Sequence, residues 1–140
     1  ELLSFEPSST GTDIAQALQY FANAQKRHCT AFLISDFIGA GNMYQPLMIA
    51  SNRHEVNAIQ IYDRREAELP NIGLVKFHDA ETGNDLWVDT AIASVRNNYA
   101  QAWRDNQNEM QQLFTRTGVD HVSVRTDEDY VKALMHLFKC

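Results

Sequence analysis

The chain has 140 residues and a mass of 16.0 kDa, which is the size of one domain. Hydrophobic residues make up 44% and charged residues 21%, as is typical of a globular protein with a sizeable core. The net charge of −6 and the pI of about 5.2 argue against a nucleic-acid partner or an anionic membrane. No apolar run approaches the roughly 20 residues of a membrane span, so we expect no membrane contact from this segment. No signal peptide is recognised and two cysteines do not make a disulfide framework, so we expect a cytoplasmic location.

The start of the sequence does not resemble the start of a domain. There is no initial methionine, and residues 1–7 are typical of a helix that runs into a loop. We expect residues 1–140 to form a single domain that is truncated at its N-terminal side.

The first third of the chain predicts a helix, a strand and a second helix. Residues 13–27 carry an apolar stripe at helical spacing, with Thr12 as the expected N-cap and Asp13 at the positive helix end. Residues 30–37 form a nearly continuous apolar run, which predicts a parallel strand covered on both faces. Residues 44–52 predict a helix with a proline in its first turn.

The middle of the chain predicts a strand and a hairpin. Residues 55–62 are a second apolar run of the parallel type, and residues 63–70 form a polar turn at its end. Residues 73–78 and 85–89 alternate between apolar and polar side chains on either side of a turn, which predicts a β-hairpin.

The last third predicts a long helix, a strand and a short helix. Residues 91–116 are amphipathic, and Gly118 is a natural helix stop. Residues 121–125 predict a third parallel strand, and Thr126 is expected to cap a helix over residues 127–138. Alternation of helices and parallel strands predicts an α/β sandwich with right-handed crossovers.

Two segments resemble a von Willebrand factor type A domain. Residues 11–18 read Gly-Thr-Asp-Ile-Ala-Gln-Ala-Leu, and residues 32–37 read Phe-Leu-Ile-Ser-Asp-Phe. The resemblance implies a three-layer sandwich with a partial, Rossmann-like parallel sheet and an inserted β-hairpin. In type A domains a metal-ion-dependent adhesion site joins an Asp-x-Ser-x-Ser loop, a threonine and an aspartate.

The resemblance assigns two residues of this chain to that metal site. Thr12 matches the threonine and Asp36 matches the aspartate at the end of the strand. No Asp-x-Ser-x-Ser segment occurs in the sequence. Because Mg²⁺ requires a nearly complete octahedron of oxygen ligands, we expect an incomplete, empty site here and Mg²⁺ or Mn²⁺ only in the full-length protein. Taken alone, Thr12 is explained by helix capping and Asp36 by capping of the next turn.

Further segments resemble the bacterial family called domain of unknown function 58. They include Ala-Ile-Gln-Ile-Tyr-Asp at 58–63, Asp-Ala-Glu-Thr-Gly at 79–83, Trp-Val-Asp-Thr at 87–90 and Thr-Asp-Glu-Asp-Tyr-Val at 126–131. Members of this family resemble partners of MoxR-type AAA+ ATPases. The resemblance therefore implies a non-enzymatic, metal-assisted adaptor that binds another protein.

Two other functions are consistent with the sequence. One is a metal-dependent α/β hydrolase that uses Asp36 at the strand tips. The other is a structural or oligomerising module with a degenerate metal site. The absence of the first strand of a type A sheet would expose an edge beside residues 30–37, so we also expect a homodimer through that edge.

The remaining polar residues give weaker signals. No two of the five histidines have ligand spacing on a predicted helix, which argues against a zinc site. No Ser-His-Asp or Cys-His arrangement is apparent, and no phosphate-binding glycine loop occurs. An acidic group near the predicted hairpin is interpreted as a solvated rim, with a docking surface or paired catalytic carboxylates as alternatives: Asp63, Glu66, Glu68, Asp79 and Glu81.

Overall fold

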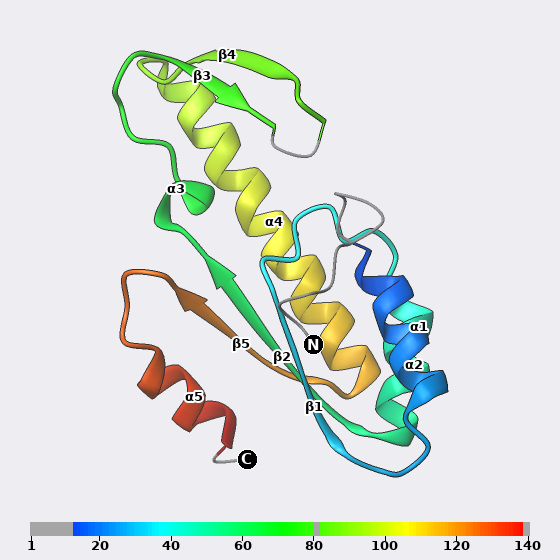
Figure 1. Ribbon diagram of the computed structural model, residues 1–140. Helices are drawn as coiled ribbons and strands as arrows, with labels where there is room; N and C mark the ends of the chain where they lie inside the picture. The colour runs from blue at the N-terminus through cyan, green and yellow to red at the C-terminus, as the bar shows by residue number, and fades with distance from the viewer. Residues whose placement is uncertain (1–12, 80–81, 139–140) are drawn as a thin grey trace, which may run out of the picture.

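A three-stranded parallel sheet forms the centre of the molecule. The computed structural model describes residues 13–79 and 82–138 (Figure 1). The sheet has the order β1-β2-β5, with β1 at Thr30–Ser35, β2 at Glu55–Tyr62 and β5 at Asp120–Arg125. A separate antiparallel hairpin pairs β3 (Leu74–His78) with β4 (Asp85–Asp89). The predicted α/β class, with a parallel sheet and an additional hairpin, is confirmed.

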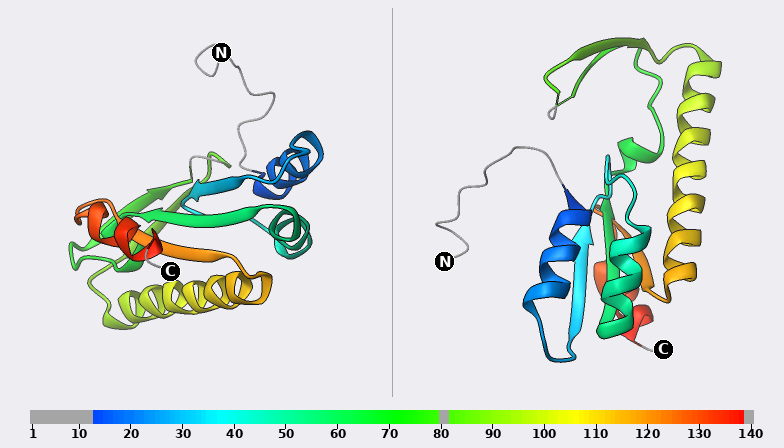
Figure 2. Two further views of the ribbon diagram at one scale, coloured as in Figure 1. Left: turned by 90° about the horizontal axis from the view of Figure 1, so that it is seen from below. Right: turned by 90° about the vertical axis from the view of Figure 1, so that its right-hand side faces the viewer.

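Helices cover both faces of this sheet. α1 (Ile14–Ala24), α2 (Tyr44–Arg53) and the C-terminal part of α4 (Ala93–Thr117) lie on one face, and α5 (Tyr130–Phe138) lies on the other (Figure 2). A single-turn helix, α3 (Arg64–Ala67), follows β2. In the part of the chain that the structure describes, no helix combines the length and apolarity needed to cross a bilayer.

The core is divided in two by β2, whose alternate side chains point to opposite faces. Val56 and Ala58 join the larger cluster with α1, α2 and α4, whereas Ile59 packs against β5 and α5. β2 is therefore buried on both faces, as its apolar sequence predicts.

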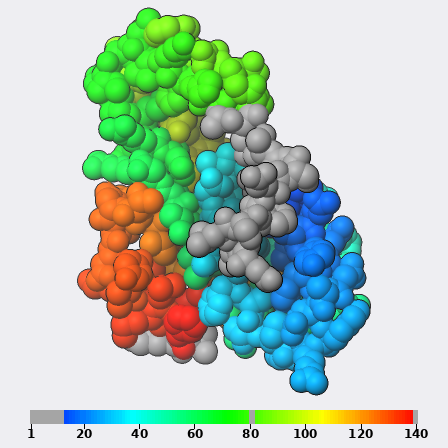
Figure 3. Space-filling model, in the orientation of Figure 1, coloured from blue at the N-terminus to red at the C-terminus, as the bar shows by residue number. Residues whose placement is uncertain are grey.

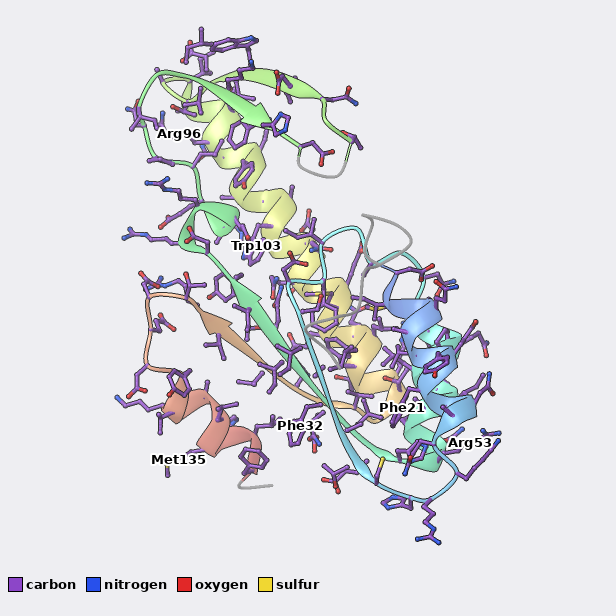
Figure 4. All side chains as sticks on the ribbon, in the orientation of Figure 1. Phe21, Phe32, Arg53, Arg96, Trp103 and Met135 are labelled. Atoms are coloured by element: carbon purple, nitrogen blue, oxygen red, sulfur yellow. The ribbon has the colours of Figure 1, made fainter. Side chains whose placement is uncertain are left out.

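β1 is an edge strand with one exposed face, and the prediction that it is covered on both faces is wrong. Its side chains alternate between half-buried and exposed, and Phe32 and Ile34 are 44% and 59% exposed. Among the described residues β1 pairs with β2 alone. Phe32 has a partial cover from Phe138 of α5, with 5.8 Å between ring centroids (Figure 4).

Two predicted helix starts are displaced in the structure. The N-cap of α1 is Asp13, whose Oδ1 accepts a hydrogen bond from the Gln16 amide at 2.9 Å; Thr12 lies outside the described residues. α5 begins at Tyr130 instead of residue 127. Residues 125–128 form a turn in which Arg125 pairs with both Asp127 and Glu128, and Asp129 Oδ1 accepts from the Val131 amide at 3.0 Å at the start of the helix.

The hairpin forms one end of the molecule, beyond the sheet (Figure 3). It is attached through Thr90, which is fully buried and whose hydroxyl accepts from the Ile72 amide at 3.0 Å and donates to the Gly73 carbonyl at 2.6 Å. Arg96 of α4 donates to the Thr90 carbonyl at 2.6 Å. α4 therefore connects the hairpin to the sheet, and it ends as predicted at Gly118, in the left-handed conformation at φ 70°.

Candidate functional site

The carboxyl ends of the three parallel strands meet at one edge of the sheet, and each strand is followed by an acidic residue. Asp36 follows β1, Asp63 follows β2, and Asp127 lies two residues beyond β5. Asp127 is neutralised by Arg125. In open α/β sheets this edge is where ligands bind, so Asp36 and Asp63 are the candidate binding residues.

Asp36 is exposed at the start of a tightly turned loop. Its Oδ1 accepts a hydrogen bond from the Ile38 amide at 3.0 Å, and the Ser35 hydroxyl oxygen accepts from the Phe37 amide at 3.0 Å. Phe37 has a left-handed backbone at φ 58°, which is unfavourable for a residue with a Cβ. The loop thus fixes the backbone on either side of the carboxylate.

Gln60 of β2 contacts the backbone of Asp36. Its side chain is only 3% exposed; its Oε1 accepts from the Ser123 hydroxyl at 2.9 Å, and its Nε2 lies 3.5 Å from the Asp36 carbonyl oxygen. Sequence reasoning missed this residue. The available signal was a glutamine within a strand predicted to be buried on both faces, where an amide needs partners.

The described residues do not by themselves make a metal site. Thr12, the second predicted ligand, lies outside them, and no group of three or more His, Cys, Asp or Glu side chains in the described chain could hold a cation. A carboxylate oxygen is a suitable ligand for Mg²⁺, and Asp36 retains Oδ2 beyond its bond to Ile38. Asp36 therefore fits the role of one ligand, and the remaining ligands would have to come from elsewhere.

Asp63 and Glu66 form an acidic pair at the same edge of the sheet. Asp63 caps α3, its Oδ1 accepting from the Arg65 amide at 2.8 Å, and its Oδ2 accepts from the Thr126 hydroxyl at 3.3 Å. Burial raises the pKa of Glu66, a hydrogen bond with the backbone of Asp63 opposes this shift, and the charges of Asp36 and Asp63 raise the pKa further. Asp63 and Glu66 have the spacing of a capping box, which was the overlooked sequence signal for α3.

A cavity of about 610 Å³ lies beside Glu66, between the loop after Asp36 and α4. Its apolar wall includes Phe37, Met43 and Met110, and α4 adds Tyr99 and Trp103. Burial, followed by the charge of Glu66, raises the pKa of Tyr99, whose hydroxyl donates to the Arg65 carbonyl at 3.0 Å. The ring of Trp103 lies 5.1 Å from that of Tyr62 (Figure 4). The size and lining of this cavity are typical of a ligand site.

The predicted acidic rim does not exist as one surface. Glu66 faces the cavity, Glu68 pairs with Arg64 at 2.8 Å on the exterior, and Asp79 belongs to the turn of the hairpin, where it accepts from Thr82. Glu81 lies outside the described residues. These acidic residues were predicted to form one group because they are near one another in the sequence. In the fold, α3 lies between the acidic residues at the sheet edge and the acidic residue of the hairpin turn.

A Cys-His contact that the sequence did not reveal lies at the opposite edge of the sheet. Cys29 Sγ is 3.6 Å from Nδ1 of buried His54, and the same nitrogen accepts from the Cys29 amide at 3.3 Å. An Nδ1 that accepts a backbone hydrogen bond has its lone pair committed, so we interpret the contact as structural. Cys140 lies outside the described residues.

The sequence comparisons give the family. Residues 1–109 match the family described as "Protein of unknown function DUF58". The uncharacterized protein MAV169 of Mycobacterium avium is 33% identical over 135 residues, covering 95% of this chain and 78% of that protein. The uncharacterized protein Rv1480 of Mycobacterium tuberculosis is 33% identical over 127 residues. The chain belongs to the DUF58 family.

The relatives differ in length from this chain. The match to Rv1480 covers 89% of this chain but 39% of that protein, and the same holds for Mb1516 of Mycobacterium bovis. Among solved structures, the conserved hypothetical protein BatB from Bacteroides thetaiotaomicron matches with a TM-score of 0.45 and 16% identity, over 99% of this chain and 67% of that one.

Proposed function

We propose that this chain is a protein–protein interaction module whose binding edge is the carboxyl end of the sheet. The observation that carries the proposal is the position of Asp36, an exposed carboxylate held in a fixed loop beside a large apolar cavity. Apolar surface with a few fixed polar groups is the composition of a binding site for a protein segment. No enzymatic role is proposed.

The finer proposal is a divalent-metal-assisted adaptor with a von Willebrand factor A-like sheet. The parallel order β1-β2-β5 and the aspartate at the end of β1 support it. In the intact protein Thr12 and Asp36 would hold Mg²⁺ or Mn²⁺ together with residues outside this chain. The cation would supply a Lewis-acidic position for a carboxylate of the partner. Asp36 would contribute one carboxylate oxygen, and the hydrogen bond from the Ile38 amide holds the carboxylate in its orientation.

Metal binding to the intact protein tests this role of Asp36. We expect calorimetric titration with Mn²⁺ to show binding that Asp36→Asn abolishes, because asparagine keeps the hydrogen bond to Ile38 but loses the charge. Asp89→Asn is the matched control, since Asp89 Oδ1 makes the same turn with the Ala91 amide at 3.0 Å on the hairpin. A titration without binding in the wild-type protein would contradict the metal role and leave a structural or oligomerising module with a degenerate site.

The proposed partner is a MoxR-type AAA+ ATPase, on the resemblance of the family to partners of such enzymes. We expect co-purification of the intact protein with the ATPase in Mg²⁺, and its loss with a chelator or with Asp36→Asn. Equal recovery in Mg²⁺ and in chelator would exclude a cation from the interface.

The chain is also proposed to associate with itself through β1. One face of this strand carries the exposed side chains of Phe32 and Ile34, and in the described part of the chain its backbone is hydrogen-bonded on one side only. Open strand edges readily pair with another chain, which supports a two-fold homodimer.

A further inference from the structure

The cavity beside Glu66 has a chemical character that the proposed metal role of Asp36 does not use. Its lining comes from the loop 37–43, from Glu66 of the short helix α3 and from the middle of α4. Figure 1 shows how the loop after β1 and α3, which are distant from α4 in the sequence, lie along that helix. The floor of the cavity is apolar, with Met43 and Met110 almost completely buried. The aliphatic part of a long side chain can therefore pack against this floor.

The charge of the cavity is entirely negative. Glu66 and Glu109 lie in its lining, and no Lys, Arg or His residue does so among the residues that the structure describes. Glu66 Oε2 is buried and has no hydrogen-bond partner within the described chain. Asp36 and Asp63 act on Glu66 with the same sign of charge. A buried carboxylate oxygen without a partner is costly, and a cation at this position would remove that cost.

The aromatic side chains of α4 add a preference for one kind of cation. Trp103 and Tyr99 line the cavity on the same side of α4, one helical turn apart. A guanidinium group is planar, stacks on aromatic faces and pairs with carboxylates through two parallel hydrogen bonds. An ammonium group is a strongly hydrated point charge and gains less from an aromatic wall.

We propose that this cavity binds an arginine side chain of a partner protein, with the guanidinium on Glu66 and Trp103 and the aliphatic stem against Met43 and Met110. This proposal rests on the proposed function in one respect, which is that the binding partner is a protein. It needs no metal at Asp36, so the two can fail separately. Arginine is a frequent anchor of protein interfaces, where it enters a desolvated pocket.

A short peptide with one central arginine, flanked by leucine and glycine, is the probe. The full chain has two tryptophans, so a Trp87→Phe background leaves Trp103 as the fluorescent reporter; Trp87 is exposed on the hairpin and lies outside the cavity. We expect saturable quenching of Trp103 by the arginine peptide. The same peptide with citrulline, which has the shape of arginine without the charge, should bind about tenfold more weakly because the charge-assisted bond is lost.

Substitutions then locate the arginine. Glu66→Gln should weaken the arginine peptide about tenfold and leave the citrulline peptide unchanged. Glu68→Gln is the matched control, since this nearby glutamate pairs with Arg64 on the exterior and should change neither affinity. Circular dichroism of both variants checks folding. Chemical shifts of the Glu66 side chain provide a second readout that does not depend on the tryptophan.

Two results would overturn the proposal: equal affinity for the arginine and citrulline peptides, or equal losses for Glu66→Gln and Glu68→Gln. A lysine peptide that binds as well as the arginine peptide would contradict the guanidinium preference. Binding that is unchanged between Mg²⁺ and chelator supports a cavity that works independently of Asp36. Loss of peptide binding in chelator would contradict that independence.

Discussion

The ring of Phe37 packs edge-on against that of Phe114, with 5.5 Å between the centroids and both side chains almost completely buried. Phe37 is the residue with the left-handed backbone directly after Asp36. That conformation costs about 1–2 kcal/mol, and burial of a phenylalanine contributes about 1.5–3 kcal/mol, so the contact is sufficient to hold it. The contact between Phe114 of α4 and Phe37 therefore holds the backbone of the loop that follows Asp36 in its observed conformation.

Removal of the Phe114 ring should strongly destabilise the protein. Phe114→Ala leaves a cavity between α4 and the sheet and should lower the free energy of unfolding by about 3–5 kcal/mol in urea titrations. Tyr20→Ala, at an exposed position of α1, should change it by less than about 0.5 kcal/mol. Similar losses for the two variants would contradict the assigned core.

The Thr90 hydroxyl should account for the attachment of the hairpin. Thr90→Val keeps the shape but removes the hydroxyl that accepts from the Ile72 amide and donates to the Gly73 carbonyl, so the free energy of unfolding should fall by about 0.5–1.5 kcal/mol. Thr90→Ser keeps the hydroxyl and should recover most of this loss. Equal destabilisation by valine and by serine would contradict the hydroxyl as the main contribution of Thr90 to stability.

The raised pKa of Glu66 predicts a pH-dependent gain from Glu66→Gln. A raised pKa means that the folded state holds the proton more tightly than the unfolded state, so this contribution to stability is complete below 4.5 and is lost as the pH rises through the raised pKa. Glutamine does not ionise. The stability of Glu66→Gln relative to wild type should therefore be greater at about pH 7.5 than at about pH 4, as measured by urea unfolding. A difference that does not vary with pH would show that Glu66 is not desolvated.

Asp85 on the hairpin should titrate at an unusually low pH. Lys76, and after it His78, hold the pKa of this carboxyl below 3.8, with Lys76 Nζ at 2.8 Å and His78 Nδ1 at 2.6 Å. The hydrogen bonds from Lys76 and His78 stabilise the charged form of Asp85, and this stabilisation is lost as the pH falls through the folded-state pKa. NMR titration should show the pKa of Asp85 moving back toward 3.8 in Lys76→Gln. Because the group is exposed, no large change in stability should accompany this shift.

A charge on the exposed face of the edge strand should prevent self-association. Ile34→Lys places a lysine on the exposed face of β1, and we expect sedimentation velocity to show the variant as a monomer at concentrations where the wild-type chain dimerises. Ile72→Lys, an exposed isoleucine near the hairpin, is the control and should leave the dimer intact. A wild-type chain that is monomeric at high concentration would contradict the edge interface.

The order of helices and strands was predictable because it is encoded in local patterns. The strand at 55–62 and the hairpin strand at 85–89 coincide with β2 and β4, since their apolar residues end at clear polar boundaries. α3 was missed because its single turn depends on one capping interaction, between Asp63 and Arg65, and not on an apolar stripe. The exposure of β1 was not predictable from its own apolar sequence, because it depends on which strands lie beside it.

The candidate site was predictable only in part. Asp36 was found because an aspartate after an apolar strand is a recognisable local signal. Glu66 and Trp103 were not associated with one another, since they are distant in the sequence and meet only through the packing of α3 against α4. Gln60 was read as part of an apolar strand, whereas its role comes from hydrogen bonds with Ser123 of β5 and with the carbonyl oxygen of Asp36, which follows β1.

The burial of α4 differs along its length. Its almost completely buried side chains are Met110, Phe114 and Thr117, all in the C-terminal third, whereas the helix extends over 25 residues, or roughly 37 Å. The N-terminal two thirds carry the hairpin and the Tyr99–Trp103 side of the cavity. Amide protons of that portion should exchange with solvent faster than those near Phe114. The cavity wall formed by Tyr99 and Trp103 therefore belongs to the part of α4 that is held by α3, Tyr62 and the hairpin, and not to the part that is buried against the sheet.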